Sequence, residues 1–109
     1  MNVQELEFQQ GEITDALSSE EARELLGQLS GWALEHNGKV LARSYKFADF
    51  VGALRFTNAV GELAEEYNHH PEVTLEYGKA TVKWWTHTAG GVTANDFLLA
   101  RETDGRADH

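Results

Sequence analysis

The chain has 109 residues, no cysteine and a formal net charge of −9, from 9 basic and 18 acidic side chains. A domain of this size buries roughly 65% of its unfolded surface, enough for one hydrophobic core but not for two lobes with a cleft between them. The lack of cysteine excludes disulfides, zinc–thiolate sites, iron–sulfur clusters and a thiol nucleophile. The negative charge disfavours nucleic acid as a ligand. We therefore expect one acidic domain whose site is shallow or shared between subunits.

The N-terminal segment, residues 1–17, is polar and acidic, with scattered apolar positions. It has neither the basic region nor the apolar run of a signal peptide, and 18 consecutive apolar residues occur nowhere in the chain. We expect a cytoplasmic protein with no membrane partner, in which this segment is an arm, or at most one loosely attached strand, with little function. The single domain is expected to span residues 18–102, and residues 103–109 to form a polar, frayed tail.

The first predicted helix follows a capping box. The Ser18 hydroxyl can accept from first-turn N–H groups while the Glu21 carboxylate reaches back to the Ser18 N–H. Apolar residues then recur at i, i+3, i+4 and i+7 up to Leu29, which gives one stripe for the core. Gly31 is the expected end of this helix.

Two further helices are predicted. Apolar residues recur every three or four positions over residues 49–68, which indicates the longest helix of the chain. Pro71 is expected to end it, because proline disfavours helical geometry in the residue before it. Thr93 and Asp96 open a final, shorter helix, in which they form a capping pair.

Two pairs of apolar segments each flank a glycine-containing dipeptide. Segments 32–36 and 39–46 flank Asn-Gly, which suits a type I′ turn, and segments 73–77 and 80–88 flank Gly-Lys, which suits a type II′ turn. Both pairs therefore predict β-hairpins. The element order is then helix-β-β-helix-β-β-helix, which predicts an α+β fold: a four-stranded antiparallel sheet made of two β-hairpins, with three helices packed on one face.

The last predicted strand has two distinct faces. Alternation places Ala80, Val82 and Trp84 toward the core and Trp85 and His87 on the opposite face. A large aromatic residue on an uncovered sheet face is a common contact for a partner or a ligand. We therefore expect Trp85 to lie in a binding site or an interface.

Three of the five histidines lie within 19 positions: His69, His70 and His87. If the Gly-Lys dipeptide forms a two-residue loop, the numbers of paired residues sum to 157, which places His70 opposite His87. A slip of one residue would place His69 there instead. In either register we expect the three imidazoles within about 10 Å of each other, since opposed Cβ atoms are roughly 5 Å apart. Glu65, one helical turn before His69, and Asp96 are the carboxylates best placed to orient them.

Imidazole titrates near neutral pH, so a histidine cluster can hold one neutral member as a base and one protonated member as an acid. This arrangement suits proton-transfer chemistry without a metal or a nucleophile. Three histidines can also bind zinc, but the adjacent His-His pair followed by proline lacks the usual ligand spacing. We expect no metal.

Each candidate also has a structural interpretation. Asp96 is explained by helix capping alone, and Glu65 by a solvated helix face. His36, beside a turn, and His109, near the end of the sequence, are interpreted as surface residues. Trp84 is assigned to the core.

The spacing of these residues resembles the signature of the pterin-4a-carbinolamine dehydratases. The similarity extends from about Ser18 to Arg101, and it includes the local sequences Thr86-His87 and Gly91-Val92-Thr93. The family's fold has a four-stranded antiparallel sheet with three helices on one side, as expected above. The pattern reads Glu65-x₃-His69-His70-Pro71-x₅-Tyr77-x₉-His87-x₈-Asp96.

The resemblance implies dehydration of 4a-hydroxytetrahydropterin, the product of aromatic amino acid hydroxylases, to quinonoid dihydropterin, with no cofactor. By position, it implies that His69, His70 and His87 are the active-site histidines. His69 and His70 are then the expected acid/base pair, and His87 is expected to bind the polar edge of the ring. The residues expected to support or bind the substrate are Glu65, Asp96, Pro71, Trp85 and Thr86.

The resemblance also implies partners. We expect a pterin substrate, a homodimer or homotetramer, and a functional link to an aromatic amino acid hydroxylase. The alternative is a non-catalytic interaction module on the same fold, because members of the family serve as a dimerisation cofactor or as assembly helpers for other proteins. Retention of all three histidines favours the enzyme.

Overall fold

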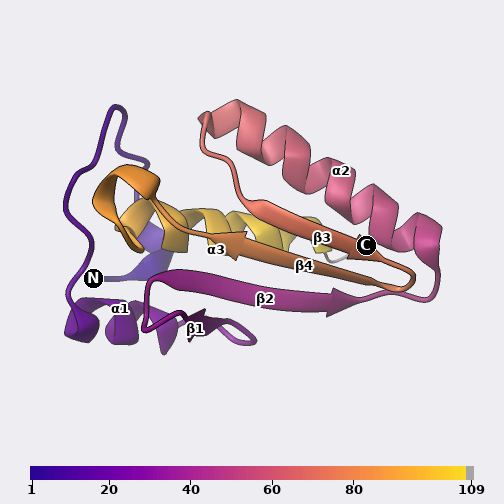
Figure 1. Ribbon diagram of the computed structural model, residues 1–109, viewed down its shortest axis with the longest axis horizontal. Helices are drawn as coiled ribbons and strands as arrows, with labels where there is room; N and C mark the ends of the chain where they lie inside the picture. The colour runs from indigo at the N-terminus through magenta and orange to yellow at the C-terminus, as the bar shows by residue number, and fades with distance from the viewer. Residues whose placement is uncertain (108–109) are drawn as a thin grey trace.

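Residues 1–107 are described by the structure, a computed structural model, and they confirm the predicted α+β class and the predicted element order (Figure 1). Three α-helices and a four-stranded antiparallel sheet occur in this part of the chain. The elements are η1 (Val3–Glu5), α1 (Ser19–Leu26), β1 (Ala33–Glu35), β2 (Val40–Lys46), α2 (Phe50–Tyr67), β3 (Glu72–Glu76), β4 (Lys79–Trp84), η2 (His87–Ala89) and α3 (Ala94–Ala107).

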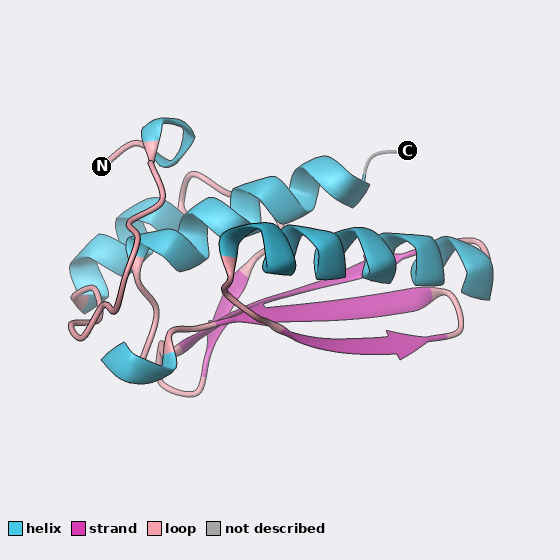
Figure 2. Cartoon of the chain, turned by 90° about the horizontal axis from the view of Figure 1, so that it is seen from above, coloured by secondary structure: helices cyan, strands magenta, loops and turns pink. Residues whose placement is uncertain are grey.

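The strand order in the sheet is β1-β2-β4-β3, so the two hairpins join through their second strands. Helices α2 and α3 pack on the same face of the sheet, and Figure 2 shows both on one side of it. No helix within residues 1–107 is long and apolar enough to span a bilayer.

Helix α1 begins as the sequence predicts and ends earlier. The Ser18 hydroxyl accepts from the Glu21 N–H at 3.1 Å, and the Glu21 carboxylate accepts from the Ser18 N–H at 3.0 Å. These hydrogen bonds hold the pKa of Glu21 below its usual value. The helix ends at Leu26, with Gly27 as its cap. The predicted end at Gly31 is therefore wrong. Gly31 lies beyond the helix at a φ of +86°, and a Cβ at this position would lie 2.7 Å from the Arg43 guanidinium carbon.

Helix α2 has the predicted bounds. Asp49 caps its N-terminus by accepting from the Gly52 N–H at 2.9 Å. Its end is set by Asn68, which takes the left-handed conformation at a φ of 51°, rather than by Pro71 three positions later. Asparagine adopts this conformation more readily than most residues, which suits it to a helix end. The chain leaves the helix at this point and carries His69 and His70 toward β3.

The second hairpin has a different loop from the predicted one. Glu76 pairs with Lys79, so paired residue numbers sum to 155 and the loop is Tyr77-Gly78. Gly78 takes a φ of +70°, and its carbonyl accepts from the Phe47 N–H at 2.8 Å. This contact docks the loop on the end of β2. The observed pairing differs from the predicted one by two residues, so each side chain of β4 stays on the predicted face of the sheet. Val82 and Trp84 are fully buried, as expected.

The first hairpin has the expected register, with Glu35 paired to Val40. Its connection spans residues 36–39. The Asn-Gly pair takes positive φ values of 59° and 81°, as a type I′ turn requires, and His36 before it is also positive at 52°. His36 is exposed, as predicted.

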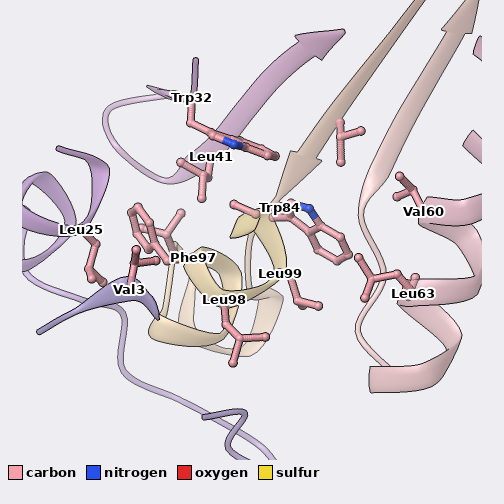
Figure 3. Close-up of a cluster of buried hydrophobic side chains, with 14 of the residues drawn as sticks. Val3, Leu25, Trp32, Leu41, Val60, Leu63, Trp84, Phe97, Leu98 and Leu99 are labelled. Carbon is pink, nitrogen blue, oxygen red and sulfur yellow. The ribbon is translucent and has the colours of Figure 1, made fainter. Parts of the chain in front are cut away.

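Trp84 lies at the centre of the buried hydrophobic cluster (Figure 3). Its indole N–H donates to the Thr103 hydroxyl at 3.0 Å, so the buried polar atom is satisfied. The cluster also includes Val3, which is 1% exposed, so the N-terminal arm is attached more firmly than expected. The other labelled members are Leu25, Trp32, Leu41, Val60, Leu63, Phe97, Leu98 and Leu99.

The expectation that the chain frays after Glu102 is wrong for the described residues, because α3 continues to Ala107. The Asp104 carboxylate accepts hydrogen bonds from the Trp32 indole at 3.1 Å, the Arg43 guanidinium at 2.9 Å and the Tyr45 hydroxyl at 2.5 Å. Burial, together with this carboxylate, raises the pKa of Tyr45. His109 lies outside the described residues.

We predict that Asp104→Ala lowers the free energy of unfolding by about 2 kcal/mol, because it leaves the Trp32 and Tyr45 donors without an acceptor. Urea unfolding measures the change. Asp15→Ala, at an exposed position, is the control and should stay within about 0.5 kcal/mol of the wild type. Equal losses in the two variants would contradict the structural role of Asp104.

Candidate functional site

The site begins with His69, the first residue after the α2 cap. Its backbone N–H donates to the Ala64 carbonyl at 3.1 Å, which fixes the chain against the last turn of α2. Its ring Nε2 lies 2.7 Å from Asp96 Oδ1. The Asp96 side chain is fully buried, and that of His69 is 18% exposed. A carboxylate hydrogen-bonded to an imidazole nitrogen fixes the orientation of the ring.

The second oxygen of Asp96 is also fully used. Oδ2 accepts from the Thr86 hydroxyl at 2.7 Å and from the Thr93 N–H at 2.8 Å. The Thr93 contact is the predicted helix cap, so capping and histidine binding coexist in one carboxylate. Thr86, next to the end of β4, is thereby joined to His69 through Asp96.

Aromatic rings hold the His69 imidazole in place. The Trp84 ring stacks on it, with centroids 5.8 Å apart and planes 8° from parallel. Phe8, from the N-terminal arm, meets it edge-on at 6.5 Å, and Phe8 also packs on Tyr67 at 5.0 Å. The imidazole of His69 is therefore fixed by a hydrogen bond on its edge and by rings beside it.

His70 forms a second, exposed pair. Its Nε2 lies 2.5 Å from Glu65 Oε2, and the side chains are 56% and 77% exposed. Glu65 and Asp96 were expected to orient the imidazoles; Glu65 pairs with His70, and Asp96 pairs with His69. The half-buried Pro71 follows directly and leads into β3.

His87 does not lie opposite His70 in a ladder. The β3–β4 pairing ends at Glu72 and Lys83, and residues 87–89 form a 3₁₀ turn closed by a bridge between Thr86 and Gly91. At this point the Thr86 hydroxyl donates to Asp96, and the chain turns away from the direction of β4. The predicted strand through residue 88 and the pairing of His70 with His87 are therefore wrong.

The exposed His87 ring packs on Trp85 with centroids 5.0 Å apart. Within residues 1–107, no hydrogen bond or ring contact links it to His69 or His70. Trp85 and His87 instead line a shallow hollow of about 300 Å³, which His36, Lys39, Val40 and Gly90 complete. Trp85 and His87 therefore lie side by side as predicted, but not on a strand face, because β4 ends at Trp84.

A cavity of about 310 Å³ lies at His69. Its inner wall includes Tyr67, Asn68, Thr86, Thr88 and Asn95. Its outer wall is formed by Phe8 and residues 10–13 of the N-terminal arm, a segment that was expected to have little function. Phe8, an aromatic residue in a polar segment, was the available signal. No group of three or more His, Asp or Glu side chains that could hold a metal occurs within residues 1–107.

The model of the family described as "Pterin 4 alpha carbinolamine dehydratase" matches residues 15–106. The chain belongs to this family. A Microcystis aeruginosa relative named "Putative pterin-4-alpha-carbinolamine dehydratase" is 49% identical over 90 residues, covering 81% of this chain and 78% of its own. A relative of the same name from Chlorobium limicola is 46% identical over 96 residues, covering 86% and 85%.

Solved structures are also similar. A "transcriptional coactivator/pterin dehydratase" from Brucella melitensis shares 34% identity, with a TM-score of 0.81 over 85% of this chain and 99% of the other. A pterin dehydratase-like protein identified as a RuBisCO assembly factor in the alpha-carboxysome has a TM-score of 0.63 at 18% identity, covering 72% and 90%. The second similarity shows a shared fold alone.

We predict that Asp96→Ala lowers the free energy of unfolding by at least about 2 kcal/mol, because His69, Thr86 and the Thr93 N–H lose one buried acceptor together. Thr86→Val removes one of these donors and should cost about 1 kcal/mol. Urea unfolding of both variants measures the difference. A smaller loss for Asp96→Ala than for Thr86→Val would refute this role of the carboxylate.

Proposed function

We propose that this protein is a 4a-hydroxytetrahydropterin dehydratase that works by histidine acid/base catalysis. The observation that carries the proposal is the pair of adjacent histidines with separate carboxylates. His69 is paired with the buried Asp96, and His70 with the exposed Glu65. Family membership supports the substrate class.

The reaction removes water across a carbon–nitrogen bond of the pterin ring. The 4a-hydroxyl takes up a proton and leaves as water, the adjacent ring nitrogen loses a proton, and a double bond forms between them. One acid and one base are needed, with no net change in protons. Two imidazoles that differ in protonation can supply both at neutral pH.

The environments of the two histidines suggest distinct roles. Asp96 accepts at both oxygens in a buried position, so the hydrogen bond to its Oδ1 holds the His69 ring in one orientation. His70 is more than half exposed, so it can exchange protons with water between turnovers. We propose His69 and His70 as the acid/base pair and His87, beside Trp85, as a group that binds the polar edge of the ring.

We further propose that the protein recycles the pterin cofactor of an aromatic amino acid hydroxylase in the cytoplasm, as a homodimer or homotetramer that needs no cofactor or metal. Trp85, which follows the last residue of β4 and is only partly buried, supports a covered surface there. The alternative is a non-catalytic interaction module. Direct assay of dehydration by the purified protein distinguishes the two, because a module would show no turnover.

We predict that His70→Ala lowers kcat at least tenfold without unfolding the protein, because a placed acid or base contributes about 10²- to 10⁴-fold. Turnover is followed by loss of the carbinolamine absorbance. His36→Asn is the matched control, since His36 is exposed and asparagine tolerates its positive φ. Wild-type turnover in the His70 variant would remove this histidine from the reaction.

We predict that Trp85→Ala raises KM more than it lowers kcat, because the indole would bind the flat substrate or line the rim of its site. Steady-state kinetics separate the two parameters. Tyr77→Ala is the control, since Tyr77 is a 75% exposed aromatic residue at the far hairpin loop. An unchanged KM would exclude Trp85 from the site.

A further inference from the structure

The N-terminal arm is fixed to the site at two points. The backbone N–H and carbonyl of Gln9 pair with the side-chain amide of Asn95, at 2.9 Å and 3.0 Å. The carbonyl of Ile13 accepts from the Thr88 hydroxyl at 2.6 Å. Between these anchors the arm turns at Gly11, which has a φ of +87°. Residues 10–12 are therefore held beside the cavity at both ends.

Both anchors belong to residues next to the site. Asn95 precedes Asp96, and Thr88 follows His87 in the chain. Asn95 is 4% exposed, and its amide makes two hydrogen bonds to one arm residue, as a neighbouring strand would. Upstream, Val3 is buried and its carbonyl accepts from Arg101 at 2.9 Å. The position of the arm is therefore set by the same elements that position His69.

The arm contributes one carboxylate to the cavity. Among the described residues that line it, Glu12 is the only acidic one, and its side chain takes part in no ion pair or hydrogen bond within residues 1–107. A carboxylate presents two acceptor oxygens side by side. The pyrimidine edge of a pterin presents an exocyclic amino group and a ring N–H side by side, which is the complementary pattern of two donors.

We infer that residues 8–13 form a wall of the pterin pocket and that Glu12 binds the amino-pyrimidine edge of the substrate. This inference rests on the proposed function, and it places a specificity-determining residue in a segment that precedes the family match at residue 15. Phe8 closes the apolar side of the same wall against Tyr67. Glu12 then binds the amino-pyrimidine edge beside His69, which lines the same cavity, and His87 contacts another polar edge of the ring.

The test compares pterin with lumazine, in which an oxo group replaces the 2-amino group. Calorimetric titration of the wild-type protein should show at least tenfold tighter binding of pterin, because the lost donor leaves the carboxylate partly unpaired. Glu12→Gln should reduce this preference to about threefold or less. Glu7→Gln, an exposed arm residue that does not line the cavity, should keep the wild-type preference.

The outcomes separate the arm from the proposed reaction. Carbinolamine turnover by the wild type tests the reaction, and the pterin preference tests Glu12. Wild-type preference in Glu12→Gln, with turnover intact, would overturn the inference alone. Absence of both turnover and pterin binding in the wild type would overturn both. Loss of the pterin preference in Glu12→Gln, with a raised KM, an unchanged kcat and an unchanged melting temperature, would support the binding of the substrate by Glu12.

Discussion

The Asp96 carboxylate is the interaction on which the site depends. It is fully buried, and each oxygen binds a different part of the chain. One oxygen holds His69 after α2, while the other holds Thr86 after β4 and the N–H of Thr93 before α3. A buried charge is tolerated only when it is well paired, so these three segments must meet at one point for the fold to be stable. The orientation of His69 is thus a consequence of the hydrogen bonds that the buried Asp96 carboxylate requires.

The two histidine pairs show how adjacent residues acquire different environments. Asn68 ends α2 in the left-handed conformation, and the next two side chains then diverge. His69 enters the core beside Trp84, whereas His70 stays near the surface with Glu65. The left-handed conformation of Asn68 is therefore followed by a fixed imidazole, that of His69, and an accessible one, that of His70. This difference is what acid/base chemistry requires of two chemically identical groups.

Local signals in the sequence predicted the fold well. The Ser18 capping box, the period of α2 and the alternation around Trp84 are each determined by neighbouring residues, and each is present in the structure. The loop of the second hairpin was not predicted, because it depends on a contact between Gly78 and Phe47, which follows β2 and is distant in sequence. The 3₁₀ turn after β4 was not predicted either, because the Thr86–Asp96 hydrogen bond beside it joins residues from different elements.

The candidate site residues were named from the sequence, but the contacts among them were not predicted. The capping pattern of Asp96 is local, but its contact with His69 spans 27 residues and leaves no periodic signal. The pairing of Glu65 with His70 follows from a single backbone conformation at Asn68. The arm was missed because its polar composition is typical of a free segment. Its attachment comes from side chains such as Asn95, far away in the sequence.

Helix α3 is tied at both ends by carboxylates, Asp96 in its first turn and Asp104 near its last. Between them its residues Phe97 to Ala100 are all buried. Local opening draws on segments with few buried contacts, so the buried middle of this helix should open rarely. The amide protons of residues 97–100 should therefore exchange with solvent only when the whole domain unfolds. The slow-exchanging core of this small protein then coincides with the segment that holds Asp96, the partner of His69.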